Sequence, residues 1–196
     1  MSQVFPQSTF FPFVVGLFGL GTCYFVWGGQ GLFGYPKSDP DVEKTVGLWG
    51  VWMGGFMQFI TGVWLFTGLT WFPVFSKAAP VYMAALAFTA YGVHWFVMGH
   101  RRYIRASAAP GAWMCIAYAW LSIIGVIAFS AAGDTPVAIV FILLALIYLS
   151  ELVGRFANAA AFLKLQNAWQ LLNGIWLMYL TFAFTLNFAN GMHFWV

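Results

Sequence analysis

Three polar side chains interrupt an otherwise apolar, uncharged stretch, AFTAYGVHW at residues 87–95. Thr89 brings a hydroxyl, Tyr91 a phenol and His94 an imidazole. On a helix Tyr91 and His94 share one face, with Phe88 a turn away. A hydroxyl can replace part of a solute's hydration while aromatic rings set the width of a pore. The stretch therefore indicates the wall of a narrow polar path. For His94 the alternatives are a packing residue and a pH sensor, since histidine titrates near ~6.5.

Side-chain amides form a second group of candidate residues. Gln58 lies in an apolar stretch, where an amide is costly unless it is paired or faces water. In LQNAWQLLNGIWLMYL the amides of Gln166, Gln170 and Asn173 step along one helical face. They could hold helices together or line the inner mouth of a pore, and the spacing fits both.

Motifs of catalysis and cofactor binding are missing from the sequence. It has no Gly-rich phosphate loop, no cysteine pair at metal spacing and no Ser, His and Asp arrangement. A b-type haem usually takes two axial ligands at matching depth, and His94 is the only histidine deep in an apolar stretch. We therefore expect no enzyme activity, no metal and no cofactor. Cys23 and Cys115 are expected to be small buried side chains, although a disulfide stays possible.

Composition determines the elements that position these residues. Of 196 residues 62% are hydrophobic and 7% charged, and the mean hydropathy is +0.83, whereas soluble domains are roughly 25% charged. Runs such as IVFILLALIYL lack the alternation of a β-barrel. A bilayer core needs about 20 apolar residues per helix. We expect an all-α integral membrane protein, one six-helix domain over 1–196, with spans at 10–33, 46–69, 79–99, 111–132, 136–155 and 167–190.

The basic residues predict the orientation in the membrane. Seven of the eight fall in or beside the loops after spans 1, 3 and 5, and only Lys77 falls on the other side. The positive-inside rule puts those three loops in the cytoplasm and both termini outside, as expected for a multi-pass protein of the plasma, or bacterial inner, membrane. The N-terminus lacks the basic region of a signal peptide, so the first span is expected to be retained. Because the charge is dispersed, we expect no nucleic-acid partner.

Glycines mark the expected helix contacts. In GLWGVWMGGFMQFITG, Gly54, Gln58 and Gly62 stack on one face, and GLFGLG in the first span offers a second small ridge. Such ridges bring membrane helices close together.

Two of these stretches resemble a known family. MGGFMQFITGVWLF has the GG, Gln and Gly spacing of the acetate uptake transporter family, the six-helix acetate and succinate proton symporters, and AFTAYGVHW is similar to its AFTSYGAFW. Gly174 and Tyr179 match a further Gly and Tyr pairing of that family. FPFVVGLFGLG aligns with its NPAPLGLMGFG, with Phe11 in place of Asn and Val14 in place of the second Pro.

The resemblance implies a solute and a site. The solute would be a short monocarboxylate such as acetate, moved with a proton or as the neutral acid, through a hexameric ring with one pore per subunit. The resemblance places the pore constriction at Leu20, Tyr91 and Leu144. Together with the polar faces above, it gives as expected pore-lining or substrate residues Gln58, Phe88, His94, Asn173 and Tyr179.

Two alternatives stay open. The chain also resembles the acid-gated urea and amide channels, through the first loop GYPKSDPD and the aromatic-ended terminus GMHFWV. Alternatively, it is a non-transporting accessory subunit of a larger membrane complex, whose bulky aromatic residues plug the lumen or cover a partner.

Overall fold

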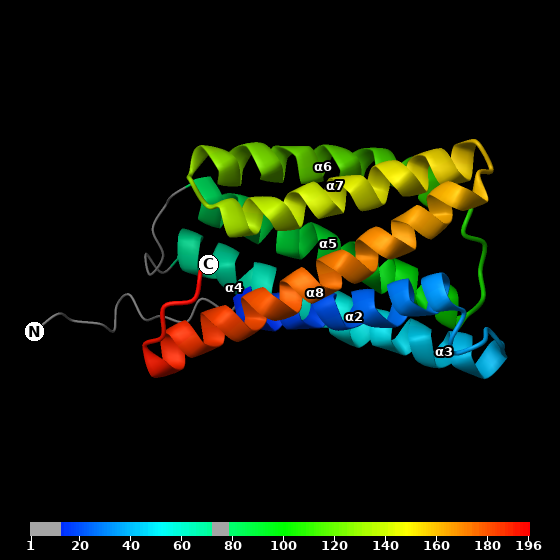
Figure 1. Cartoon of the computed structure of the whole chain (residues 1–196), viewed down its shortest axis with the longest axis horizontal. Helices are drawn as coiled ribbons and strands as arrows, with labels where there is room; N and C mark the ends of the chain where they lie inside the picture. Colours follow the sequence, from blue (N-terminus) through cyan, green and yellow to red (C-terminus); the bar gives the residue numbers. More distant parts are fainter. Residues whose placement is uncertain (1–12, 72–78) are drawn as a thin grey trace, which may run out of the picture.

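The computed structural model describes residues 13–71 and 79–196, and these are helical over most of their length (Figure 1). Within this described part, six stretches are long and apolar enough to cross a membrane, which confirms the predicted six-helix class. The second of these stretches consists of three consecutive elements, α3, η1 and α4. The elements are α2 (Phe13–Phe33), α3 (Pro40–Trp49), the π-helical segment η1 (Gly50–Met57), α4 (Gln58–Thr70), α5 (Ala79–Tyr103), α6 (Gly111–Ala131), α7 (Thr135–Phe156) and α8 (Ala160–Asn190).

Two helices begin earlier than the apolar pattern predicts. The second span starts at Pro40 instead of 46, and the sixth at Ala160 instead of 167. The side chain of Asp39 accepts hydrogen bonds of 2.9 Å from the N–H groups of Asp41 and Val42, and Pro40 occupies the first turn. These capping residues stabilise a helix start that lies beyond the apolar stretch. Residues 10–12 of the predicted first span lie outside the described part of the chain.

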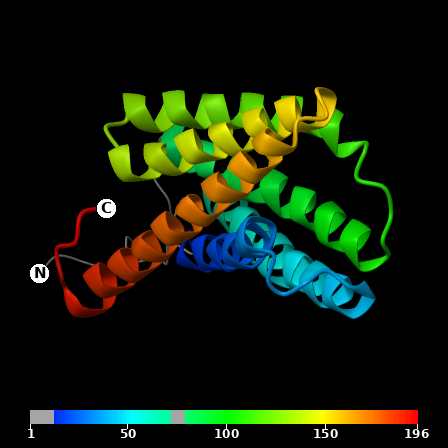
Figure 2. The ribbon, with the colours of Figure 1, turned by 45° about the vertical axis from the view of Figure 1, so that its right-hand side comes forward.

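The helices extend between the two ends of the bundle, α6 and α7 lie side by side, and α8 crosses α4 and α5 obliquely (Figures 1 and 2). Helix α8 packs on α2 and α7, α6 packs on α7, and α5 packs on α4 and η1. The connections after α2, α5 and α7 all lie at one end of the bundle (Figure 1). We call this the basic end, because the following residues lie in or beside these connections: Lys37, Lys44, Arg101, Arg102, Arg105, Arg155 and Lys164.

Gly62 of the predicted glycine face does bring backbones together, since a methyl group there would lie 2.5 Å from the backbone nitrogen of Thr89 on α5. Two further glycines do the same at another contact. A methyl group on Gly47 would lie 2.7 Å from the carbonyl oxygen of Gly99, and one on Gly99 would lie 2.5 Å from the backbone nitrogen of Val51. Both distances are too short for a side chain, so α5 reaches this contact with α3 and η1 only because both positions are glycine. Cys23 and Cys115 are free and buried, as expected.

Candidate functional site

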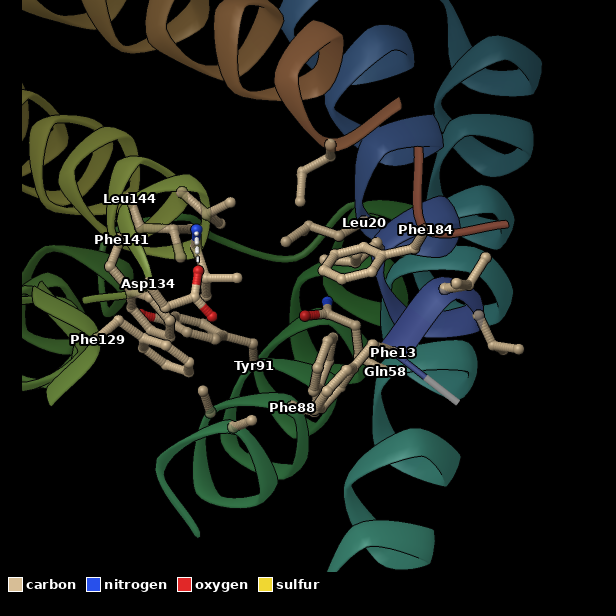
Figure 3. Close-up of a pocket in the computed structure, with 18 of the residues that line it drawn as sticks. Phe13, Leu20, Gln58, Phe88, Tyr91, Phe129, Asp134, Phe141, Leu144 and Phe184 are labelled. Atoms are coloured by element: carbon tan, nitrogen blue, oxygen red, sulfur yellow. Dashed lines mark hydrogen bonds between the residues drawn. The ribbon is translucent and has the colours of Figure 1, made fainter. Parts of the chain in front are cut away.

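A cavity of about 580 Å³ opens inside the bundle at the end opposite the basic end (Figure 3). We call it the apolar cavity. Its lining comes from α2, α4, α5, α6, α7 and α8, and nearly all of it is aliphatic or aromatic. Leu20, Tyr91 and Leu144 line it, as do Gln58 and Phe88. Five of the eight residues predicted for the site therefore surround one space, contributed by four helices.

Four residues form the floor of this cavity. Leu20 on α2, Tyr91 on α5, Leu144 on α7 and Leu177 on α8 are the deepest lining positions of their helices. They are 3%, 2%, 2% and 0% exposed. The three residues expected at the constriction thus lie at one level, where the cavity ends.

A chain of two hydrogen bonds holds the side chain of Tyr91 in place. The hydroxyl oxygens of Tyr91 and Ser122 are 2.8 Å apart, and the Ser122 hydroxyl donates to the Tyr118 carbonyl at 2.7 Å. Because a serine hydroxyl has a single hydrogen, Tyr91 must be the donor to Ser122. Any further hydrogen bond to the Tyr91 oxygen then has to come from a donor group. The geometry favours a solute that carries an O–H or N–H over an anion.

Asp134 is the one charged side chain among the described residues that line the apolar cavity. It caps α7 by accepting a hydrogen bond from the Val137 N–H at 3.1 Å (Figure 3). Burial raises the pKa of this carboxyl, and the cap hydrogen bond opposes the shift only in part. Gln58, in contrast, is neutral and nearly enclosed, and its amide N–H donates to the Gly54 carbonyl at 2.8 Å.

A second cavity, of about 520 Å³, opens at the basic end. We call it the polar cavity. Gln30, Arg101, Arg102, Arg155, Gln166 and Gln170 are among its lining residues. The amides of Gln166 and Gln170 do line a cavity mouth, and Gln166 also donates to Glu151 at 2.9 Å. Arg101 and Arg102 were missed as cavity residues, although their cluster GHRRYIR at a helix end was a usable signal.

A dividing layer separates the two cavities. On each of three helices we compare the deepest residue of the apolar cavity with the nearest residue of the polar cavity. These pairs are Leu20 and Trp27 on α2, Tyr91 and Met98 on α5, and Leu177 and Gln170 on α8. The two residues of each pair are seven positions apart, which is about 10 Å along a helix. The layer is filled by aromatic and polar side chains that are almost completely buried: Tyr24, His94, Trp95, Tyr148 and Asn173.

Two residues predicted to line a pore lie in this layer and line neither cavity. The His94 ring packs against Tyr118 and Tyr148, with centroid distances of 4.5 and 5.8 Å. Asn173 is 0% exposed, and neither the nitrogen nor the oxygen of its amide has a hydrogen-bond partner among the described residues. An unpaired buried polar group costs about 1–3 kcal/mol, so Asn173 presents both a free donor and a free acceptor between the cavities.

Tyr179 is not brought together with the other predicted residues. Its ring stacks on Trp176 at 5.0 Å, and its hydroxyl donates to the Trp195 carbonyl at 2.9 Å. It therefore holds the C-terminal segment against α8 and lines neither cavity.

The fold and its two cavities define a class: a helical bundle whose described part has six stretches long and apolar enough to cross a membrane, with a cavity at each end. Its architecture is similar to that of the bacterial acetate channel SatP, with a TM-score of 0.71, 19% sequence identity, and coverage of 92% of this chain and 94% of that chain. No protein-family model and no curated protein sequence matches the chain. The likeness is one of fold.

Proposed function

We propose that this chain is a membrane channel or proton-linked transporter for a short monocarboxylate such as acetate. One observation supports this most strongly: in a fold shared with an acetate channel, Leu20, Tyr91 and Leu144 form the floor of one cavity. Three side chains from three helices can narrow a path in this way. In this proposal the path runs from the apolar cavity through the dividing layer to the polar cavity.

The solute crosses the floor as the neutral acid. The described lining of the apolar cavity has no basic side chain to balance a carboxylate, and an unpaired anion in an apolar environment is very costly. The hydroxyl oxygen of Tyr91, which donates to Ser122, can accept a hydrogen bond from the O–H group of an undissociated acid. Protonation outside and release inside would couple flux to the proton gradient.

A urea or amide pore is the second candidate. The unpaired amide of Asn173 and the acceptor oxygen of Tyr91 suit a solute with several N–H donors as well as they suit an acid. An accessory subunit, by contrast, would have no need for an unpaired amide in its centre. We further propose a homo-oligomeric ring, a hexamer with one pore per subunit, in the bacterial inner membrane, with the basic end in the cytoplasm.

Uptake by proteoliposomes tests the proposal. Labelled acetate and labelled urea are supplied separately at two pH values, with empty vesicles as the baseline. Acetate flux that rises as the pH falls supports the monocarboxylate, and urea flux instead supports the amide pore. If neither solute enters above the baseline while the chain co-purifies with unrelated subunits, the accessory role replaces transport.

A further inference from the structure

Two ion pairs border the polar cavity, and each contains a different carboxylate. Arg102 on α5 binds Glu43 on α3, with Nε 2.5 Å from Oε2 and Nη2 2.9 Å from Oε1. Arg155 on α7 binds Glu151 one turn earlier, with Nη2 2.6 Å from Oε1. Neither carboxylate is left to neutralise another cation.

Arg101 lies close enough to both ion pairs to interact electrostatically with them, yet it belongs to neither. It lines the polar cavity, and among the described residues it has no ion-pair partner. Its Nε is buried and has no hydrogen-bond acceptor. The charge of a partly buried guanidinium without a carboxylate partner is unfavourable, and an anion in the polar cavity that Arg101 lines would balance it.

The rest of the described lining is also suited to an anion. Lys37, Arg101, Arg102 and Arg155 line the polar cavity, against one acidic side chain, Glu43. Gln166, Asn167 and Gln170 line the same wall and can donate amide N–H groups. A planar guanidinium matches the two oxygens of a carboxylate in a bidentate geometry.

We propose that Arg101 is the central residue of a binding site for a small carboxylate anion in the polar cavity. This rests on the proposed function, since the occupant is the ionised form of the monocarboxylate that crosses the floor as the neutral acid. The two cavities then hold different forms of one solute. The apolar cavity accepts the uncharged acid, and the polar cavity binds the anion.

Equilibrium dialysis of labelled acetate against the purified full chain in detergent, at near-neutral pH, tests the site. Arg101→Gln removes the charge, Arg101→Lys keeps it, and Lys164→Gln removes an exposed charge at the same end of the bundle. We expect saturable binding to the wild type, a Kd raised about tenfold or more by Arg101→Gln, partial retention in Arg101→Lys and no change in Lys164→Gln. Melting temperatures of all three variants show that each is folded.

Several results would overturn the site. One is a Kd for Arg101→Gln equal to that of the wild type, and another is the absence of saturable acetate binding to the wild type. Displacement of acetate by equal concentrations of chloride or inorganic phosphate would make it a general anion site instead. Acetate uptake by wild-type proteoliposomes separates the two proposals. Uptake with binding that does not depend on Arg101 rejects the site alone, and binding that depends on Arg101 without uptake rejects transport alone.

Discussion

The Tyr91 hydroxyl donates a hydrogen bond to Ser122 at 2.8 Å, and this contact joins α5 to α6 at the floor of the apolar cavity. It holds the ring at the level of Leu20 and Leu144 and leaves only acceptor capacity on the phenol oxygen. The position of Tyr91 and the acceptor-only state of its oxygen thus have the same cause.

Removing the Ser122 hydroxyl tests whether this hydrogen bond determines the position of Tyr91. Ser122→Ala frees the Tyr91 hydroxyl, and we expect a loss of about 0.5–1.5 kcal/mol in the free energy of unfolding, together with weaker preference for the neutral acid. Thermal unfolding and the pH dependence of acetate flux measure the two effects. Ser130→Ala, on the same helix but exposed, is the control and should change neither. Equal effects of Ser122→Ala and Ser130→Ala on stability and flux would contradict the role of the hydrogen bond between Tyr91 and Ser122.

Asn173 gives a prediction in which stability and function change in opposite directions. Asn173→Leu replaces an unpaired buried amide by an aliphatic side chain of similar size, which should raise the free energy of unfolding by about 1–3 kcal/mol. If the dividing layer is the solute path, acetate flux should fall in the same variant. Thermal unfolding and uptake are measured on one preparation. A more stable variant with unchanged flux would place Asn173 off the path.

The Arg102 and Glu43 pair should matter more than its exposed neighbour. Both side chains are mostly buried, at 17% and 19% exposure, and hydrogen bonds to charged groups contribute about 1.5–3 kcal/mol. Glu43→Gln should lower stability by that order, because it weakens the tie between α3 and α5. Asp41→Asn breaks the exposed pair with Lys44 on the same helix and should have little effect. Similar melting temperatures for the two variants would contradict this ranking.

The burial of Asp134 lets us predict the direction in which stability changes with pH. Burial raises the pKa of its carboxyl in the folded chain above the unfolded value of about 3.9. The folded state therefore binds the proton more tightly, so stability falls as the pH rises from about 4 through the folded pKa and then levels off. Asp134→Asn keeps a capping side chain and should flatten this part of the profile. Melting temperatures measured against pH test it, and a stability that rises across this interval because of Asp134 would contradict it.

The sequence predicted the fold better than the surroundings of single residues. Apolar length gave six spans because lipid imposes that length on any helix. The resemblance led to Leu20, Tyr91 and Leu144, which line one cavity floor. It could not show that Tyr179 binds the Trp195 carbonyl, or that Arg101 lacks a partner while Arg102 has one. Those outcomes depend on which side chains from distant helices meet, and neighbouring arginines have the same local pattern.

The start of α3 shows a second limit. Lys44 and the other charged residues of this segment lie outside the predicted span 46–69, but the Asp39 cap extends the helix to Pro40 and brings Glu43 within reach of Arg102. The π-helical turns of η1 were likewise not predicted, since hydropathy does not report how a helix is wound.

The central claim is that solutes pass the floor formed by Leu20, Tyr91 and Leu144. The most direct measurement is uptake of labelled acetate and labelled butyrate by proteoliposomes containing the wild type, Tyr91→Ala or Tyr82→Ala. Tyr82 is on the same helix and is exposed. We predict acetate flux through the wild type with little butyrate, and a butyrate to acetate ratio that rises in Tyr91→Ala and stays constant in Tyr82→Ala. An unchanged ratio in Tyr91→Ala, or no acetate flux above empty vesicles, would contradict the claim.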